Sequence, residues 1–216
     1  MEDNREEIRC AAEGGGGSGI TRRRFITTMS AGAVGVAASG SLSGAAGIPE
    51  TGVVTAGSRV PLTLSINGRS HRVLVEARWT LLYVLREVLG FTGAKEGCER
   101  GECGSCTVLI DDVPRYACMI LALEAEGTEI TTVEGLMDGE ALGPVQQAFA
   151  DEDAFQCGYC TPGQVVAVEG LLRKHPNPTI PEIRRGISGN LCRCGAYAHI
   201  VKAADRAAKG RKGGDA

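Results

Sequence analysis

Eight of the nine cysteines fall into two quartets whose spacing is typical of metal ligands. The first quartet is Cys98, Cys103, Cys106 and Cys118, spaced C-x4-C-x2-C-x11-C. The second quartet is Cys157, Cys160, Cys192 and Cys194, spaced C-x2-C-x31-C-x-C. Four thiolates are the ligand set of one iron–sulfur cluster, and C-x4-C-x2-C is the plant-ferredoxin spacing for a [2Fe–2S] centre. The quartets therefore predict two clusters and an electron-transfer role, which requires a donor and an acceptor.

Zinc and disulfide bonds are the alternatives for the same cysteines. Structural zinc sites usually contain two short C-x2-4-C pairs. The first quartet instead has a distant fourth cysteine and the second ends in C-x-C, so the spacing favours iron. Glycine lets a backbone approach a cluster closely and turn its N–H groups toward sulfur. The glycines that neighbour the ligands are Gly97, Gly101, Gly104, Gly158 and Gly195.

The first 56 residues are interpreted as an export signal and linker. A Gly-rich run at 14–19 precedes Thr21-Arg22-Arg23-Arg24-Phe25-Ile26, which fits the twin-arginine export pattern. The segment at 25–46 that follows is too polar and too rich in Gly for a stable membrane span. Cleavage is expected after Ala46 or Ala56.

Export of a folded protein agrees with the cluster prediction. Iron–sulfur clusters are assembled in the cytoplasm, so a protein that carries them must leave already folded, which the twin-arginine route permits. Cys10 precedes the motif and would be removed, which leaves no stray thiol in an oxidising compartment. We therefore expect a periplasmic location.

Composition limits the other functions. The net charge of -3 is nearly balanced, which does not favour a nucleic-acid binder. Aromatic residues make up only 4% of the chain, and the 31 glycines suit a chain that wraps tightly around something inorganic. A mature body of about 160 residues can bury one or two modest cores.

The mature body is expected to contain two domains, divided between residues 136 and 137. Upstream, alternating apolar residues, an Asn67-Gly68 hairpin signal and a Thr80 N-cap indicate strands around one helix, the pattern of a β-grasp ferredoxin. Leu81, Leu82, Leu85, Val88 and Leu89 would form the buried face of that helix. The expected elements are strands at 60–66 and 71–76, a helix at 81–89, a ligand loop at 90–106, and strands at 107–110, 115–123 and 129–133.

Downstream of this division the strand signals disappear. Pro162 and Pro181 suit the first turns of helices, and 175–178 breaks the chain between them. Helices are expected at 145–151, 162–174, 182–187 and 197–209, followed by a charged tail at 210–216. The second quartet would lie at helix starts and interhelical turns of a small bundle.

Three motifs carry a resemblance to a known family. They are the segments 97–106 (GCERGECGSC), 155–163 (FQCGYCTPG) and 189–195 (GNLCRCG). In this order they resemble the [2Fe–2S] small subunit of the xanthine-oxidase family of molybdenum hydroxylases, over residues 60 to about 207. With the twin-arginine leader, the chain is most similar to the iron–sulfur subunit of periplasmic aldehyde oxidoreductases.

The resemblance implies an α+β chain with two cluster domains. A β-grasp [2Fe–2S] ferredoxin-like domain (57–136) would precede an all-α four-helix-bundle [2Fe–2S] domain (137–209). The implied partners are a large subunit with the molybdopterin cofactor and a flavin (FAD) subunit, which together with this chain would form a heterotrimer. The second-quartet cluster would lie nearest to molybdenum and the first nearest to the flavin. Gln156 and Cys194 match positions that contact the pterin in relatives.

The resemblance also implies that hydroxylation occurs on the partner. Tyr159, Tyr197 and His199 are interpreted as packing residues, and no catalytic residue is expected in this chain. The predicted function is that of the electron-transfer subunit of a molybdenum-dependent aldehyde oxidoreductase. A free-standing two-cluster ferredoxin-like carrier and a zinc-stapled interaction module are the alternatives.

Overall fold

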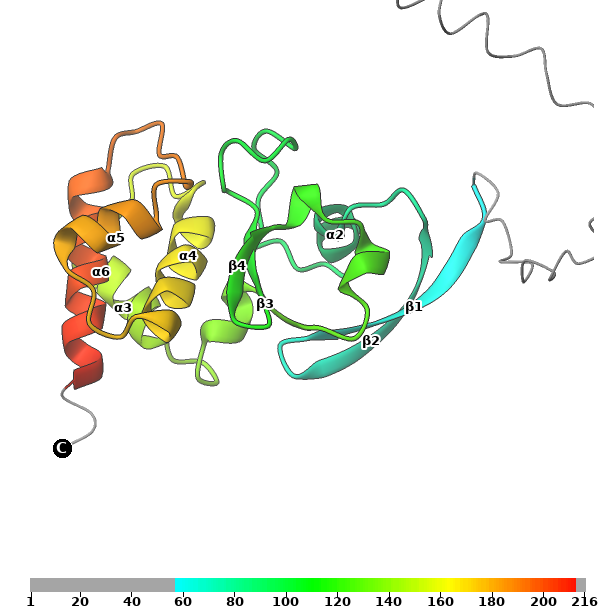
Figure 1. Ribbon diagram of the computed structural model, residues 1–216, viewed down its shortest axis with the longest axis horizontal. Helices are drawn as coiled ribbons and strands as arrows, with labels where there is room; N and C mark the ends of the chain where they lie inside the picture. Colours follow the sequence, from blue (N-terminus) through cyan, green and yellow to red (C-terminus); the bar gives the residue numbers. More distant parts are fainter. Residues whose placement is uncertain (1–56, 213–216) are drawn as a thin grey trace, which may run out of the picture. The chain divides into compact units, whose positions relative to one another are not determined.

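The computed structural model describes residues 57–212, and these form a mixed sheet followed by a helical bundle (Figure 1). The expected Gly-rich run, the Arg22–Arg24 motif, the cleavage positions and Cys10 lie outside the described residues. The sheet has five strands in the order β2-β1-β5-β3-β4. The strands are β1 (Arg59–Ile66), β2 (Arg69–Glu76), β3 (Thr107–Ile110), β4 (Val113–Tyr116) and β5 (Glu129–Thr131).

Two tight hairpins and one parallel pairing build this sheet. Asn67 and Gly68 have φ values of 53° and 70°, as a two-residue hairpin turn requires. Asp111 and Asp112 (φ 47° and 65°) make the second turn in the same way. The last strand, β5, pairs parallel to β1 and antiparallel to β3, so it joins the two hairpins. This arrangement confirms the predicted β-grasp domain.

The helix of the β-grasp domain differs from the prediction in its second half. Thr80 accepts a hydrogen bond from the Tyr83 N–H at 3.2 Å, as expected of an N-cap, and begins α2 (Leu81–Tyr83). The chain then forms a π-helical segment, η1 (Val84–Val88). Because a π-turn is wider than an α-turn, it rotates the later side chains about the axis. Val84 is buried and Val88 is exposed, so the prediction that Val88 belongs to the buried face is wrong.

The predicted strand at 115–123 is also wrong beyond Tyr116. The chain leaves the sheet and forms two short 3-10 turns, η2 (Ala117–Met119) and η3 (Ala122–Ala125). The apolar residues of this segment pack into the core from these turns, with Ala117, Cys118 and Ala122 buried. An apolar run therefore does not require a strand when a ligand residue must turn inward.

Four helices form the second domain, as expected. They are α3 (Pro144–Asp151), α4 (Thr161–Lys174), α5 (Ile180–Gly186) and α6 (Tyr197–Lys212). A further short turn, η4 (Val133–Leu136), connects the sheet to α3. α6 continues past the expected end at Lys209. The core of the bundle is centred on Phe149, Val168, Leu172, Ile183 and Ile200.

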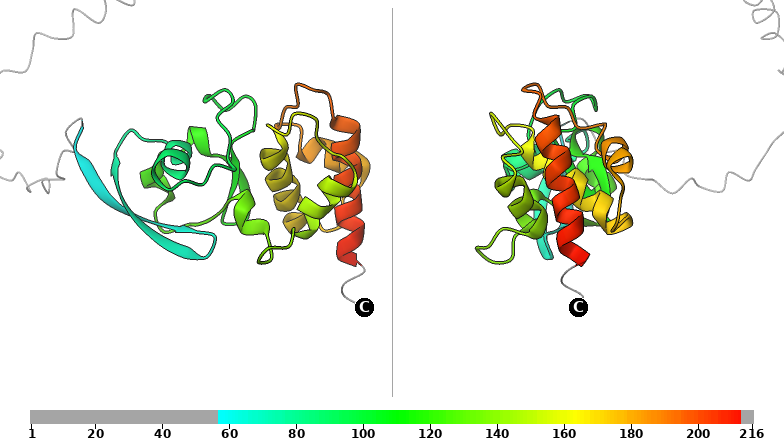
Figure 2. Two further views of the ribbon diagram at one scale, coloured as in Figure 1. Left: turned by 180° about the vertical axis from the view of Figure 1, so that it is seen from behind. Right: turned by 90° about the vertical axis from the view of Figure 1, so that its left-hand side faces the viewer.

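α4 connects the helical core to the sheet (Figures 1 and 2). Gly170 on α4 lies so close to β4 that a Cβ there would be 2.3 Å from the Pro114 Cγ atom. Arg173 on the same helix pairs with Asp112 in the β3–β4 turn. In residues 57–212, no helix is both long and apolar enough to cross a membrane.

Candidate iron–sulfur sites

The four cysteines of the first quartet meet at one end of the sheet. Cys98 and Cys103 lie in the loop that follows η1, Cys106 directly precedes β3, and Cys118 lies in η2. Cys98 interacts with Cys103, and Cys106 interacts with Cys118 and Cys103. All four thiols lie near Tyr116, whose pKa is raised by burial and by the charges of the quartet. The fold thus gathers the residues that the spacing singled out.

The two pairs of the first quartet have opposite environments. The Sγ atom of Cys98 accepts backbone hydrogen bonds, the strongest from Arg100, together with Glu102 at 3.2 Å, and its pKa falls to about 7. Positive φ angles at Glu99 and Gly101 (53° and 77°) turn this loop. Burial raises the pKa of Cys106 to about 12. A buried thiol of this kind is deprotonated readily only when a metal supplies positive charge.

The second quartet forms in the same way from helix ends. Cys157 and Cys160 precede α4, with Cys160 at its N-cap position, and Cys192 and Cys194 lie between α5 and α6. Cys157 interacts with Cys194 and Cys192, and Cys160 interacts with Cys192. The 31 residues between Cys160 and Cys192 contain α4 and α5, and this helical hairpin brings Cys192 back beside Cys160.

Backbone N–H groups again surround the more exposed sulfurs. The Tyr159 N–H and then the Cys194 side chain lower the pKa of Cys157. Burial opposes ionisation of Cys192, but the Ala196 N–H at 3.4 Å, the Cys160 side chain and two further N–H groups outweigh it, so its pKa is lowered. Burial raises the pKa of Cys160 to about 12. N–H groups that point at sulfur stabilise negative charge there, as cluster ligands require.

The donor sets fit a two-iron cluster. Within the described part of the chain, no three His, Cys, Asp or Glu side chains converge to hold a single metal ion. The sulfurs nevertheless interact in pairs, Cys98 with Cys103 and Cys106 with Cys118. These two observations are compatible because each iron of a [2Fe–2S] cluster takes two cysteine ligands, so the four sulfurs need not surround one point.

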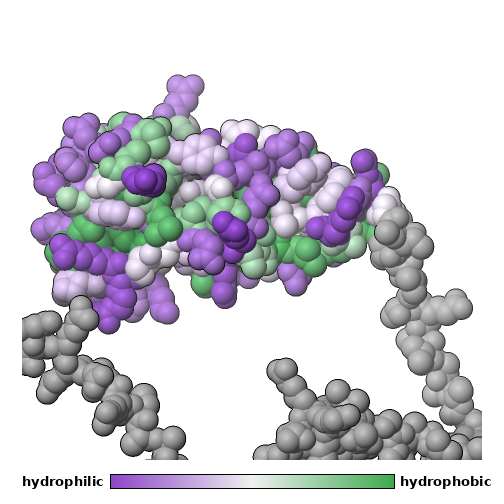
Figure 3. Space-filling view, turned by 90° about the horizontal axis from the view of Figure 1, so that it is seen from above, coloured by the Kyte–Doolittle hydropathy of each residue, from purple (hydrophilic) through white to green (hydrophobic). Residues whose placement is uncertain are grey.

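The residues expected to contact a pterin lie together on an exposed face. Gln156, Cys157 and Cys194 are all exposed. Large apolar side chains that are also exposed lie within three residues of these positions along the chain, namely Phe155, Tyr159, Leu191 and Tyr197. Figure 3 views the molecule from the side of the ligand loops and shows hydrophobic surface between hydrophilic residues over the helical bundle. Exposed apolar surface beside a polar rim is typical of a protein–protein contact.

The two quartets are linked by direct hydrogen bonds between their loops. The Leu191 N–H, one residue before Cys192, donates to the carbonyl oxygen of Cys103 at 2.9 Å. The Tyr159 hydroxyl donates to the carbonyl oxygen of Glu96 at 2.5 Å. Tyr159 therefore holds the two loops together, a role more specific than the packing that the sequence suggested.

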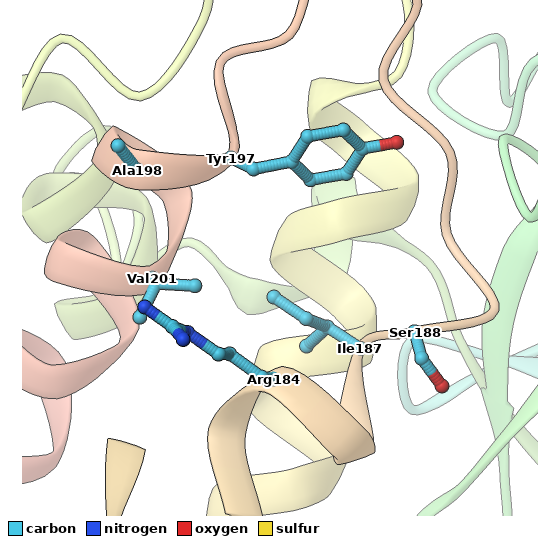
Figure 4. A pocket seen from close by; sticks show the side chains of 6 residues that line it. All are labelled: Arg184, Ile187, Ser188, Tyr197, Ala198 and Val201. Carbon is cyan, nitrogen blue, oxygen red and sulfur yellow. The ribbon is translucent and has the colours of Figure 1, made fainter. Parts of the chain in front are cut away.

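Tyr197 and His199 also have structural partners. The Tyr197 hydroxyl accepts a hydrogen bond from the Cys192 N–H at 2.9 Å, and the Nδ1 atom of His199 lies 2.8 Å from the Glu152 carbonyl oxygen. Tyr197 lines an open hollow of about 560 Å³ between α5 and α6, into which Arg184 extends toward α6 (Figure 4). None of the eight cysteines lines this hollow.

Both halves of the chain match known cluster-binding domains. Residues 64–131 match the family described as "2Fe-2S iron-sulfur cluster binding domain", and residues 132–205 match "[2Fe-2S] binding domain". The chain is 41% identical over 204 residues to the iron–sulfur-binding subunit of an aldehyde oxidoreductase from Escherichia coli O157:H7, covering 88% of each chain. It is 45% identical over 151 residues to one of the subunits of nicotinate dehydrogenase from Pseudomonas putida, covering 70% of this chain and 96% of that one.

Solved structures share the fold. Quinoline 2-oxidoreductase from Pseudomonas putida 86 has a chain that matches with a TM-score of 0.70 and 43% identity, over 74% of this chain and 99% of that one. The aldehyde oxidoreductase from Desulfovibrio desulfuricans matches with a TM-score of 0.68 and 38% identity, over 71% of this chain but only 17% of its own. The chain belongs to the [2Fe–2S] iron–sulfur subunits of the xanthine-oxidase family of molybdenum hydroxylases.

Proposed function

We propose that the chain relays electrons within a periplasmic, molybdenum-dependent aldehyde oxidoreductase. Electrons would pass from a molybdopterin cofactor on a large subunit through the second quartet, then through the first quartet to FAD on a third subunit or to another acceptor. Two relatives that are iron–sulfur-binding subunits of aldehyde oxidoreductases, at 41% and 44% identity, support aldehydes as the substrate class.

The observation that carries the proposal is the contact between the two quartets. Cys103 belongs to the first quartet and Cys192 to the second, and only the hydrogen bond from the Leu191 N–H to the Cys103 carbonyl separates their main chains. A hydrogen-bonded contact between the two ligand loops supports electron exchange between the two proposed centres. A chain that bound two unrelated partners would not need such a contact.

The chain's own residues hold, insulate and tune the two centres. We propose that Cys98, Cys103, Cys106 and Cys118 bind one [2Fe–2S] cluster and Cys157, Cys160, Cys192 and Cys194 the other. Each cluster, when bound, supplies one-electron redox chemistry. The buried residues Cys106, Cys118 and Cys192 exclude water from one side of each centre, and the N–H groups around Cys98 and Cys157 stabilise negative charge on the other.

The exposed face around the second quartet supports the direction of the relay. Gln156 and Cys194 are accessible there, as residues that contact a cofactor on another chain must be. The loop of the first quartet has a different surface, with Glu99, Arg100 and Glu102 exposed. We propose that the apolar face meets the molybdopterin subunit, whereas the charged loop meets the flavin subunit.

The proposed domain limits and location rest on the sequence. The domains are proposed at 57–136 and 137–209, and α6 extends the second to Lys212. The Arg22–Arg24 motif supports export of the folded chain, and the relay would then end in a periplasmic acceptor.

The test is to isolate the chain from its native host through an affinity tag and to analyse what accompanies it. We expect a stable complex with two larger chains, molybdenum and FAD, and four irons with acid-labile sulfide per copy of this chain. Electron paramagnetic resonance (EPR) of the reduced complex should show two [2Fe–2S] signals. Purification as a lone two-cluster protein would support the free-standing carrier, and zinc in place of iron would disprove the relay.

A further inference from the structure

A buried amide group lies between the two quartets and contacts the backbone of both. Asn190 is only 6% exposed. Its Nδ2 atom lies 2.9 Å from the Gly104 carbonyl oxygen and 3.0 Å from the Gly163 carbonyl oxygen. Gly104 lies between Cys103 and Cys106, and Gly163 follows Cys160 in the first turn of α4. One side chain therefore bridges the ligand segments of both domains.

The backbones approach so closely here that only glycine fits on either side. A Cβ at Gly104 would lie 2.8 Å from the Cγ atom of Asn190, and one at Gly163 would lie 2.5 Å from the Gly104 carbonyl oxygen. Thr107 completes the site, since its Oγ1 atom accepts from Asn190 at 2.9 Å while donating to the Gly104 carbonyl oxygen at 2.6 Å. The Asn190 amide thus donates hydrogen bonds to three oxygen atoms where the two loops lie closest.

The main chain of Asn190 is held as firmly as its side chain. Its N–H donates to the Ile187 carbonyl oxygen at 3.0 Å, and its own carbonyl oxygen accepts from the Nε2 atom of the fully buried Gln164 at 2.6 Å. The next residue, Leu191, donates its N–H to the Cys103 carbonyl oxygen at 2.9 Å. Two successive donors, the Asn190 amide and the Leu191 N–H, therefore bond to two successive carbonyls, those of Gly104 and Cys103.

We propose that Asn190 is a positioning residue that holds the Leu191 N–H on the Cys103 carbonyl and so sets the electronic coupling between the two clusters. This inference rests on the proposed relay function. Electron tunnelling decays less steeply through covalent and hydrogen bonds than through space, and this contact joins Cys103 to Cys192 by such bonds alone. One electron lost by the second centre is gained by the first, and no proton or covalent bond changes.

The chemistry of the site requires an amide. The Nδ2 group supplies two N–H donors that are shared among three oxygen acceptors. An alanine would remove both donors and leave a gap between the loops. We expect the loops to separate slightly and the Leu191 hydrogen bond to weaken, while every cysteine ligand remains.

The experiment compares Asn190→Ala with a milder variant and a matched control in the tagged full chain. Thr107→Val keeps the shape of Thr107 but removes the hydroxyl that accepts from Asn190. Asp112→Asn is the control, because it weakens another contact between the domains, the ion pair with Arg173, away from the cysteines. In each protein, hydrogen–deuterium exchange at Leu191 and the spin–spin splitting of the two reduced-cluster EPR signals are measured.

In Asn190→Ala, the Leu191 amide should exchange about tenfold faster, the factor expected for loss of one hydrogen bond, and the spin–spin splitting should decrease. Thr107→Val should change the exchange rate and the splitting in the same direction by a smaller amount. If Asn190→Ala does not fold, the result for Thr107→Val tests the proposal. Asp112→Asn should behave as wild type.

Two results would overturn the inference. One is unchanged exchange and splitting in the variants when both clusters are present, and the other is an equal loss in Asp112→Asn. A wild-type protein with fewer than two clusters would instead disprove the proposed function, and the coupling role with it, so the two failures are distinguishable.

Discussion

The eight cysteines share one side-chain chemistry but occupy different environments, and this difference distinguishes their roles. In each quartet, burial disfavours the ionised form of one thiol. It raises the pKa of Cys106 in the first quartet and of Cys160 in the second to about 12. In each quartet another thiol, Cys98 or Cys157, has a lowered pKa because of backbone N–H groups. The buried thiols need the positive charge of a bound metal in order to ionise, so binding of the clusters also stabilises the fold around them.

Replacing one ligand should remove one cluster and leave the other. Cys103→Ser should abolish the EPR signal of the first quartet, and Cys160→Ser that of the second, because each quartet closes within its own domain. Iron per chain should fall by about half in either variant. Loss of both signals in both variants would show instead that the two clusters assemble cooperatively.

The sequence singled out the two cysteine quartets that the fold brings together, but not the residue between them. Cysteine spacing is a local property with few chemical interpretations, so all eight positions could be singled out. Asn190 lies inside a recognised motif, but the sequence alone indicated no role for it. Its hydrogen-bond partners Gly104 and Thr107 are 86 and 83 residues away along the chain. A buried amide that bridges two domains becomes visible only when the fold brings those segments together.

Among the elements, α4 connects most of the molecule. Its first turn follows Cys160, its middle packs on β4, and its last turn carries Arg173 toward the β3–β4 turn. The closest approach is at Gly170, where a Cβ would meet the Pro114 ring at 2.3 and 2.7 Å and the Leu109 side chain at 2.9 Å. A proline ring cannot rotate away, so this position requires glycine for lack of space.

Gly170→Ala should therefore destabilise the protein despite the better helix propensity of alanine. Overpacking a close contact costs about 1–3 kcal/mol, which exceeds the roughly 1 kcal/mol that alanine gains over glycine in a helix. The matched control is Gly210→Ala in α6, where nothing lies within 4 Å of the added Cβ. Thermal unfolding should show a lower Tm for the first variant and an unchanged or higher Tm for the second. Equal Tm values would contradict the close contact.

Ion pairs between α3 and α6 give the bundle an acid-sensitive contact. Glu152 pairs with Lys202 at 2.7 Å and Arg206 at 2.9 Å, and hydrogen bonds from these cations lower its pKa below the ordinary 4.5. A lowered folded pKa means that the contribution is complete above the ordinary value and is lost as pH falls below it.

Glu152→Gln should lower the Tm at neutral pH, and the difference from wild type should shrink as the pH falls through the region below about 4.5. Glu124→Gln is the control, since Glu124 lies in η3 and accepts only from the Leu121 N–H. A difference that stays constant with pH would contradict the role of the charge.

Element prediction succeeded where local signals act alone and failed where tertiary contacts decide. Asn67-Gly68, Thr80 and Pro162 are short-range signals, and the turn, cap and helix start occur as expected. The run at 115–123 is apolar enough for a strand, but Cys118 must turn inward beside Cys106, so the chain forms 3-10 turns instead. The π-turn of η1 has no local signal at all.

On the scale of the whole molecule, the proposed export and the proposed relay both depend on the order of assembly. We propose that the clusters are inserted before export and that the leader carries the folded chain with its partners. Arg22→Lys with Arg23→Lys should then leave this chain and its partners in the cytoplasm, because the leader would lose its paired arginines. Cell fractionation followed by immunoblotting measures this. Normal periplasmic activity in the double variant would contradict the assigned signal.

The direction of the relay can be tested at the exposed face of the second quartet. Gln156 is exposed beside Cys157, and its amide is proposed to bond the pterin of the partner subunit. Gln156→Ala should slow reduction of both clusters by aldehyde, by up to about tenfold for one lost hydrogen bond, without changing iron content. Gln147→Ala is the matched control, because Gln147 is also an exposed glutamine and bonds only to Asp151 on its own helix.

Rapid-freeze EPR of the complex after aldehyde addition resolves the order in which the clusters are reduced. The second-quartet signal should appear first and the first-quartet signal later, since the electron is proposed to enter at the exposed apolar face and to cross the Leu191–Cys103 contact. Cys103→Ser should leave the second-quartet signal reducible by aldehyde, whereas Cys160→Ser should prevent reduction of the first. A first-quartet signal that still forms at the wild-type rate in Cys160→Ser would mean that electrons enter from the β-grasp end, and the relay would run the other way.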